Sequence, residues 1–538
     1  MPVTRAQSAI EMLVRERARA NPDAAWLAFK DETYTWAEVL RYANRAANGW
    51  LELGVRPTDR VAMLLDNCPE FIWSYLGLLF VGAGPVPVNT AQRGVTLHHI
   101  LADSGARAAI VSDSLRSSFA EARAGCPDLA HTVVVGGAAG SGFDWDADRL
   151  LSGADTDPVI DVDSAPAAAA MLYTSGTTGP PKGVVTSTYD ASPIGILLGA
   201  SGVRPGETMY TPLPLFHGNA LYVSMIGSIV LDARFALAER FSASRFFDDC
   251  RRYDAVEFNA LGGMISILLK QPERSDDADN PVRTVLSAGC PPDRWVEFEQ
   301  RFGLRLVEWF GMVDAPGILL NSDGRVGSMG KPIAGVEFAV VDDDDEPVPT
   351  GQIGQLVFRH PQGQLTHYHG LPDATDAAYR GGWFHTGDLA SQDEDGFYYY
   401  RGRKKESIRR LGENISAWEI ETVVNSHPAV QESAAHAVPS ELGEDEVKLV
   451  VVPKPGAHVS PEDLTQFCEG KVARYAVPRY VEILGELPKT GTQRVQYGEL
   501  KERGVTPATW DRLAAGDADG SASGSTTTSG STTKEHHA

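Results

Sequence analysis

The stretch "RVAMLLDNCPEFIWSYLGLLFVGAGPVPVN", residues Arg60–Asn89, contains the pattern of a strand, a helix and a second strand. The apolar runs "RVAMLL" and "GPVPVN" predict short buried strands, and the segment between them predicts a buried helix around Glu70–Leu79. The same alternation continues through a helix from Thr96, the run "AAIVSD", a helix from Ser114 and the run "TVVVGG". Strands that alternate with helices form a doubly wound, largely parallel sheet, so we predict an α/β fold.

An amphipathic helix is expected just before this stretch. Thr35 and Glu38 have the spacing of a capping box, apolar residues then recur at helical spacing, and Gly54 is placed to end the helix. Its apolar face indicates that the helix packs against the rest of the domain.

Composition limits the classes of function. The 538 residues, 43% of them hydrophobic and 22% charged, indicate a soluble globular protein with more than one domain. The net charge of −23 opposes binding to nucleic acid or to an anionic membrane, so an anionic ligand must be held by local groups. The five cysteines lack metal-ligand spacing, and the N-terminal segment lacks the apolar core of a signal peptide. We therefore expect free thiols, a cytoplasmic location and no membrane span.

A domain boundary is expected at "YYYRGRKKES", Tyr398–Ser407, where an aromatic strand gives way to a basic run. We predict a large N-terminal domain over 1–402 and a small α+β domain over 403–513. Residues 514–538 have almost no apolar side chains and are predicted to form a disordered tail.

The loop "YTSGTTGPPKG", Tyr173–Gly183, follows an apolar run that predicts a buried strand. Its glycines allow backbone N–H groups to converge on a ligand, its hydroxyls add donors, and Lys182 adds a positive charge. These features predict a phosphate site at the carboxyl end of a strand of the doubly wound sheet. A surface linker is the plainer alternative. A Walker A loop is excluded by spacing, because Pro181 precedes Lys182 and Gly183 follows it.

The extended motif "YTSGTTGPPKGV" resembles the phosphate-binding signature of the adenylate-forming superfamily, which includes acyl- and aryl-CoA ligases, nonribosomal-peptide adenylation domains and luciferases. Further motifs follow in the order of that family, and two stretches are most similar to its carnitine and crotonobetaine CoA-ligase-like branch. The motifs are "PLPLFHGNA", "LSAGCPP", "WFGMVDA", "WFHTGDL", "YRGRKKESIRRLGENISAWEIE" and "LPKTGTQRVQ". The branch resemblance is carried by "FNALGGMISILLKQP" and "TQRVQYGELKERGVTPATWDR".

The resemblance implies ATP- and Mg²⁺-dependent adenylation of a small organic acid. The carboxylate attacks the α-phosphorus of ATP to give an acyl adenylate and pyrophosphate, and in the ligases the thiol of CoA then displaces AMP. The protein contributes chiefly positioning and charge neutralisation around the phosphates.

The resemblance also implies the residues of a nucleotide site. The loop holds the β- and γ-phosphates, Asp388 accepts the ribose hydroxyls, and Arg403 reaches the ribose or a phosphate. The full implied set is Thr174, Ser175, Gly176, Thr177, Thr178, Gly179, Gly289, Cys290, Pro291, Phe310, Gly311, Met312, Val313, Asp388 and Arg403.

An acid pocket and a group of catalytic side chains are implied in the same way. His217 would form an aromatic wall at the mouth of the pocket. The alternative, in which His217 has only a structural role, is weighted equally. The implied pocket residues are His217, Phe258, Asn259, Gly262 and Gly263. The implied catalytic residues are Lys182, His217, Asp314 and Arg494, of which Asp314 is also the magnesium ligand.

Three positions depart from the family pattern. Val313-Asp314 replaces the usual Thr-Glu, so a hydroxyl contact to the α-phosphate is lost and the metal-binding carboxylate is one methylene shorter. Arg494 replaces a lysine that spans the α-phosphate and the substrate carboxylate, which preserves charge but changes geometry.

The resemblance also implies that Lys405 occupies the hinge position about which the C-terminal domain of this superfamily rotates between the two half-reactions.

These departures keep two alternatives open. In the first, the activated acid passes to an amine without CoA, as in diazotases that activate nitrite for an aryl amine. In the second, the chain binds a nucleotide without catalysing a reaction. The sequence indicates neither the identity of the acid nor the oligomeric state.

Overall fold

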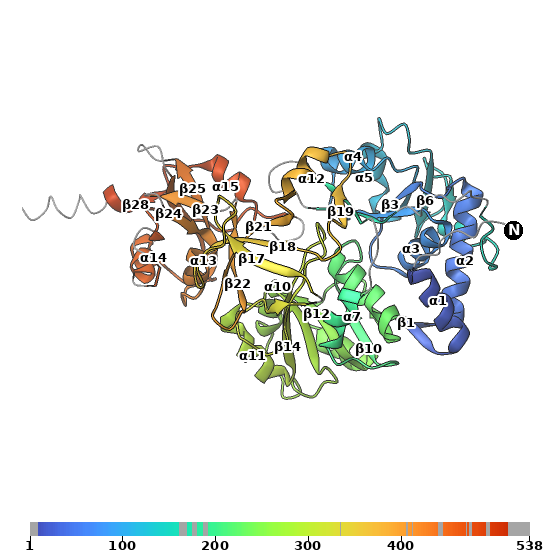
Figure 1. Cartoon of the computed structure of the whole chain (residues 1–538), viewed down its shortest axis with the longest axis horizontal. Coiled ribbons are helices and arrows are strands. Elements are labelled where there is room, and N and C mark those ends of the chain that lie inside the picture. Colours follow the sequence, from blue (N-terminus) through green and yellow to red (C-terminus); the bar gives the residue numbers. More distant parts are fainter. Residues whose placement is uncertain are drawn as a thin grey trace, which may run out of the picture. The chain divides into compact units, whose positions relative to one another are not determined.

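The computed structural model describes residues 9–160, 169–174, 180–186, 192–333, 335–404, 407–410, 413–439, 445–469, 471–472, 476–490 and 495–514 (Figure 1). The chain divides into two compact units. Unit 1 consists of Met1–Thr386 and Ala390–Tyr400, and unit 2 consists of Gly387–Leu389 and Arg401–Ala538.

A five-stranded sheet in unit 1 confirms the strand and helix alternation predicted from the sequence. Its order is β4-β3-β5-β6-β7, and every neighbouring pair is parallel. The elements are β3 (Arg60–Leu64), α3 (Pro69–Val81), β4 (Gly84–Pro87), α4 (Gly94–Asp103), β5 (Ala108–Ser112), η1 (Asp113–Leu115), α5 (Arg116–Ala122), β6 (His131–Val135), β7 (Trp145–Asp146) and α6 (Ala147–Leu150).

The predicted amphipathic helix is α2 (Trp36–Leu53), which lies beside α3 (Figure 1). Thr35 and Glu38 form the capping box, and Gly54 ends the helix in a left-handed conformation at φ 105°. The two helices approach so closely that a Cβ on Gly77 would lie 2.7 Å from the Cβ of Ala46. The apolar face of α2 is therefore buried, as its sequence pattern predicts.

The largest sheet has nine strands in the order β16-β15-β14-β13-β12-β10-β11-β1-β2. The run from β14 to β1 is parallel, and β2, β15 and β16 pair antiparallel at the two edges. Its strands are β1 (Ala25–Phe29), β2 (Glu32–Thr35), β10 (Thr208–Thr211), β11 (Arg234–Leu237), β12 (Ala255–Leu261), β13 (Thr284–Ala288), β14 (Arg305–Phe310), β15 (Leu319–Asn321) and β16 (Lys331–Pro332). The associated helices are α1 (Ala9–Ala20), α7 (Ser192–Gly199), the π-helix η2 (Asn219–Ile226), α8 (Gly227–Leu231), α9 (Phe246–Tyr253), α10 (Gly262–Leu269) and α11 (Pro292–Phe302).

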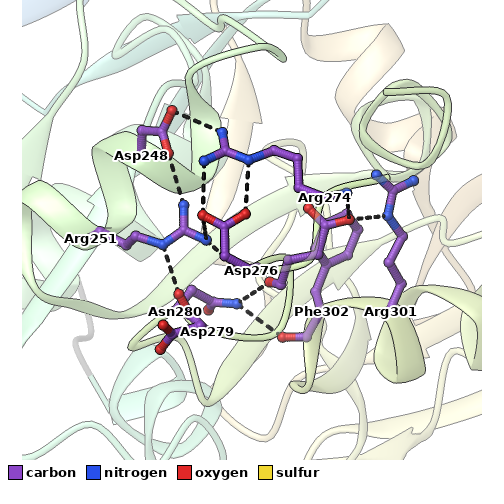
Figure 2. Close-up of polar contacts among 9 residues, drawn as sticks. Asp248, Arg251, Arg274, Asp276, Asp279, Asn280, Arg301 and Phe302 are labelled. Carbon is purple, nitrogen blue, oxygen red and sulfur yellow. Dashed lines mark hydrogen bonds and ion pairs between the residues drawn. The ribbon is translucent and has the colours of Figure 1, made fainter. Parts of the chain in front are cut away.

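A polar network fixes the connection that leads into β13 (Figure 2). Arg251 on α9 binds Asp248 at 2.8 Å and donates to the carbonyl of Asp279 at 2.7 Å. Asn280 donates to the carbonyl of Phe302 at the end of α11, at 3.0 Å. The connection is thus held by hydrogen bonds to α9 and to the end of α11.

The Gly-rich loop does not leave the doubly wound sheet, contrary to the sequence prediction. It joins β8 (Met171–Tyr173) to β9 (Gly183–Thr186), which pair antiparallel in a separate sheet of order β19-β9-β8. The third strand, β19 (Thr366–Tyr368), also pairs antiparallel with β9. The loop is therefore the tip of a hairpin rather than a strand-to-helix turn.

A further sheet has the order β17-β18-β21-β20, with β22 beside β21. Its elements are β17 (Glu337–Val341), β18 (Gly354–Arg359), α12 (Pro372–Ala378), β20 (Tyr379–Arg380), β21 (Trp383–Gln392) and β22 (Tyr398–Arg403). The chain passes from unit 1 to unit 2 along β22.

Unit 2 has an α+β arrangement around its own buried cluster. Its sheet has the order β25-β26-β27-β28, and β23 and β24 form a separate hairpin. A fully buried pair of side chains, Lys448 and Glu482, joins two neighbouring strands, and Arg503 also binds Glu482 at 2.8 Å. The elements are β23 (Ser407–Arg410), β24 (Glu413–Ser416), α13 (Ala417–Asn425), β25 (Val430–Pro439), β26 (Asp445–Pro453), α14 (Pro461–Cys468), β27 (Tyr480–Ile483), α15 (Tyr497–Arg503) and β28 (Trp510–Asp511).

Among the described helices, none combines the length and the apolar character needed to cross a bilayer. The predicted tail, 514–538, lies outside the described residues apart from its first position.

Candidate active site

The carboxyl ends of β12, β13 and β14 lie next to one another in the parallel part of the nine-stranded sheet. After β13 the chain turns through Gly289, whose φ of 82° is in the left-handed region. At the end of β12, a Cβ on Gly262 would lie 1.9 Å from the carbonyl oxygen of Gly289. Glycine at position 262 therefore allows the two strand ends to approach, and both residues belong to the predicted site.

Glu308 on β14 braces this turn and is not among the site residues predicted from the sequence. Its carboxylate accepts hydrogen bonds from the backbone N–H groups of Gly289 and of Cys290, the latter at 3.2 Å. Burial raises the pKa of Glu308 to about 8, although the two N–H groups favour the charged form. The only signal in the sequence is a lone acidic residue within the apolar strand "RLVEWF".

The residues predicted to line the adenine lie at the ends of two neighbouring parallel strands. Gly289, Cys290 and Pro291 follow β13, and Phe310 ends β14 immediately before Gly311 and Met312. A Cβ on Gly311 would lie 2.8 Å from the Trp309 ring, so this position also requires a small residue. The fold thus brings the two predicted motifs to one edge of the sheet.

Lys182 and Asp314 are connected by a tyrosine that the sequence analysis also missed. The Nζ atom of Lys182 lies 4.5 Å from the ring centroid of Tyr368, and the Tyr368 hydroxyl donates to Oδ1 of Asp314 at 2.8 Å. Thr366, on the same strand, donates from its hydroxyl to the backbone carbonyl of Asp314. Burial, and then the charge of Asp314, raise the pKa of Tyr368, so its hydroxyl stays protonated and acts as the donor. The predicted phosphate lysine and metal ligand therefore share one support.

Both ends of the Gly-rich loop are held by described residues. The N–H of Thr174 donates to the carbonyl of Lys182 at 3.0 Å, which closes the base of the hairpin. Nε2 of His99 lies 2.9 Å from the carbonyl oxygen of Pro181, and the Tyr173 hydroxyl donates to Asp103 at 2.6 Å. The described ends of the loop are thus fixed, and Lys182 lies beside Tyr368.

The residues predicted for the acid pocket are brought together only in part. Asn259 on β12 donates from Nδ2 to Oδ1 of Asn219, the first residue of η2, at 2.7 Å. The neighbouring Gly218 packs so closely that its Cβ would lie 2.8 Å from Cγ2 of Val313. His217 precedes these residues and is exposed. One segment, residues 217–219, thus adjoins both Asn259 and the Val313-Asp314 motif.

Phe258 lies on the other face of β12 from Asn259. It is fully buried and packs against Phe246 on α9, with ring centroids 4.7 Å apart. Phe258 is therefore part of the core behind the sheet. Gly263, in contrast, has no atom within 4 Å of where its Cβ would be.

The remaining predicted residues are in unit 2 or outside the described part of the chain. Asp388 on β21 is 1% exposed and belongs to unit 2, and Arg403 ends β22 in the same unit. The predicted residues outside the described ranges are Ser175, Gly176, Thr177, Thr178, Gly179, Lys405 and Arg494.

Asp314 fits the magnesium role that the sequence predicts. In the described part of the chain, no three His, Cys, Asp or Glu side chains gather into a metal cluster. Magnesium bound with a nucleotide usually takes one or two carboxylates together with phosphate oxygens and water. A single carboxylate beside the phosphate loop is consistent with that mode of binding.

Comparisons with known proteins identify the family of the chain. The family model "AMP-binding enzyme" matches residues 14–368, and "AMP-binding enzyme C-terminal domain" matches residues 419–494. The crotonobetaine/carnitine–CoA ligase of Salmonella heidelberg (strain SL476) is 31% identical over 483 residues, covering 87% of this chain and 93% of that protein. The chain therefore belongs to the AMP-binding enzyme family, whose members form adenylates.

Solved structures of acid–CoA ligases have the same α/β fold. The anthranilate CoA ligase AuaEII, in complex with anthranoyl-AMP, superposes with a TM-score of 0.82 at 26% identity, covering 94% of this chain and 98% of that chain. The o-succinylbenzoate CoA synthetase of Bacillus subtilis, in complex with ATP and magnesium ion, gives a TM-score of 0.78 at 26% identity, and the superposition covers 91% of this chain and 99% of that chain. The chain is accordingly an enzyme of the AMP-forming acyl-CoA ligase family, with ATP and Mg²⁺ bound in a homologous structure.

Proposed function

We propose that this enzyme adenylates a small organic acid with ATP and then transfers the acyl group to CoA. The observation that carries the proposal is the connection from Lys182 through Tyr368 to Asp314, at the base of the Gly-rich loop. It brings one positive charge and one carboxylate together, and this pairing supports binding of a nucleotide triphosphate with its metal ion. The acid–CoA ligases among the relatives support CoA as the acceptor.

In the first half-reaction, a carboxylate oxygen of the acid bonds to the α-phosphorus while the bond from that phosphorus to the bridging oxygen of pyrophosphate breaks. Lys182 neutralises charge on the leaving phosphates, and Asp314 would hold the magnesium ion. That ion, when bound, neutralises phosphate charge as a Lewis acid. The Gly289 turn, braced by Glu308, lies against the adenine, and Asp388 and Arg403 hold the ribose. In the second half-reaction, the CoA thiol loses its proton to solvent and its sulfur bonds to the acyl carbon, while the bond from that carbon to the phosphate oxygen breaks and AMP leaves.

The substituted positions define where this enzyme departs from its relatives. Val313 lies against Gly218, so an apolar contact occupies the place of the usual threonine hydroxyl. Arg494 supplies the charge of the usual lysine as a planar fork, and Lys405 acts as the hinge between the two half-reactions. We propose that residues 403–513 form the moving domain.

Pyrophosphate release tests the proposal. The enzyme is incubated with ATP, Mg²⁺ and a panel of organic acids, with and without CoA, and pyrophosphate and CoA consumption are both measured. Acid-dependent pyrophosphate with stoichiometric loss of CoA is the expected result. Pyrophosphate that requires nitrite and an aryl amine but not CoA would instead support an amine acceptor. ATP binding without pyrophosphate, under every acid, would show a non-catalytic nucleotide-binding protein.

Lys182→Ala tests the proposed phosphate contact. We expect a reduced but measurable rate, because the backbone donors of the loop are still present. The set of acids that release pyrophosphate should be unchanged in this variant, since the proposed role of Lys182 is to bind the nucleotide and not the acid.

A further inference from the structure

One face of the nine-stranded sheet carries a carboxyl group with no role in the chemistry described above. Glu257 on β12 pairs in register with Met209 and Thr284 on the neighbouring strands. Residues paired across strands lie on the same face of a sheet. Met209 belongs to a buried cluster with Leu198 of α7 and Val223 of η2. Glu257 therefore points toward α7 and η2.

Glu257 is completely buried, and within the described part of the chain neither of its carboxyl oxygens has a hydrogen-bond partner. Burial alone raises its pKa well above the usual range of a glutamate. Glu308, two strands away in the same sheet, is also buried but accepts hydrogen bonds from two backbone N–H groups. Buried polar groups in proteins are almost always paired, so the bare carboxyl of Glu257 requires an explanation.

Two more unpartnered acceptors share this region. Asn259 lies two residues further along β12 and thus on the same face, and its Oδ1 atom has no partner among the described residues. Its Nδ2 atom is already used by Asn219. On η2, the buried Ser224 hydroxyl also has no partner within the described ranges. The cluster of Glu257, Asn259 and Ser224 therefore presents mainly oxygen acceptors, and a ligand that donates hydrogen bonds would satisfy them.

The cluster lies on the face of β12 that leads back from the sheet edge. Strands rise about 3.3 Å per residue, so Asn259 is about 7 Å and Glu257 about 13 Å from Leu261, where β12 ends. An acid with its carboxylate at the edge would extend its other end along this face. The cover is η2, a π-helix, and helices of this kind are frequent at functional sites.

We propose that Glu257 and Asn259 form the far end of the acid-binding site and receive an amino group on the tail of the substrate. The N–H groups of such an acid satisfy the bare oxygens, and an acid with a purely hydrocarbon tail leaves them unpaired. Because these oxygens are fully covered, the incoming acid displaces side chains of η2, such as Val223. The placement of the substrate carboxylate rests on the proposed function, but binding of the acid does not require adenylation to occur.

Equilibrium binding of paired acids tests this proposal. Calorimetric titrations compare amino acids of graded length, from 3-aminobenzoate and 4-aminocinnamate to 8-aminooctanoate, with the same acids lacking the amino group. Where the amino group is far enough from the carboxylate to reach Glu257, the amino-substituted acid should bind at least about tenfold more tightly than the same acid without the amino group. The reason is the hydrogen bond that the amino group makes to a charged or buried partner. Glu257→Met should abolish that preference without weakening the hydrocarbon acid. Glu308→Gln, a change at the other buried carboxyl, should leave the preference intact.

The outcomes separate this proposal from the proposed function. Equal affinity within every pair, no binding of any amino acid, or a preference that survives Glu257→Met would each overturn the subsite. A preference that depends on Glu257, in an enzyme that releases no pyrophosphate with any acid, would overturn the adenylation and leave the subsite standing. The melting temperature provides a second readout, because Glu257→Met removes an unpaired buried carboxyl and should raise it.

Discussion

Replacing Tyr368 with phenylalanine removes one hydroxyl and tests how Asp314 is held. Phenylalanine keeps the ring 4.5 Å from Nζ of Lys182, and only the hydrogen bond of 2.8 Å to Asp314 is lost. Hydrogen bonds to charged groups contribute about 1.5–3 kcal/mol. Since Tyr368 is only partly buried, the lower value applies, and about 1.4 kcal/mol corresponds to a tenfold change in rate. We expect kcat/KM for ATP to fall about tenfold.

The assay is acid-dependent pyrophosphate release across a range of Mg²⁺ concentrations. A carboxylate that has lost its orienting donor should need more Mg²⁺ for half-maximal rate, and calorimetry should show weaker nucleotide binding with Mg²⁺ but not without it. Tyr379→Phe is the matched control, because the Tyr379 hydroxyl contacts Thr366 at 2.7 Å rather than the carboxylate. If Tyr368→Phe leaves the Mg²⁺ requirement unchanged, or if Tyr379→Phe raises it equally, Tyr368 does not position Asp314.

Three other changes have defined outcomes. Because its pKa is raised to about 8, Glu308 keeps a proton in the folded state between about pH 4.5 and pH 8. The contribution of Glu308 to stability therefore falls as pH rises through that window. Glu308→Gln should flatten this part of the dependence of the free energy of unfolding on pH, as measured by chemical denaturation. Gly262→Ala should lower both stability and ATP affinity, because its Cβ would lie 1.9 Å from the carbonyl oxygen of Gly289, and unchanged ATP binding would contradict this. Lys448→Met should cost about 3 kcal/mol in the free energy of unfolding, since it leaves Glu482 buried with fewer partners. A change below about 1 kcal/mol would show that Arg503 compensates fully.

Local patterns predicted the parts of the fold that local physics determines. The capping box at Thr35 and Glu38, the helix end at Gly54 and the alternation from Arg60 onward are all present, because each depends on residues within one turn or one strand. The placement of the Gly-rich loop was wrong. Its strand β8 has three residues and pairs in a sheet completed by β19, a partner far away in the sequence.

The side chains that support the site were missed for the same reason. Tyr368 and Glu308 act on Asp314 and on the Gly289 turn, and the sequence separations hide these contacts. Glu257 and Glu308 share one recognisable signal, a single acidic residue inside a mostly apolar strand. Such a residue indicates a buried carboxyl, but only the fold shows that one is paired and the other is not.

The hairpin at the base of the Gly-rich loop changes the entropy of nucleotide capture. Pairing of β8 with β9, together with the bond from Thr174 to Lys182, brings the loop ends together before any ligand arrives. Closing a loop costs conformational entropy, and here folding meets that cost in advance. Binding of a phosphate group therefore does not have to bring Thr174 and Lys182 together. Because β9 also pairs with β19, the strand that follows the loop is joined directly to the strand that carries Tyr368.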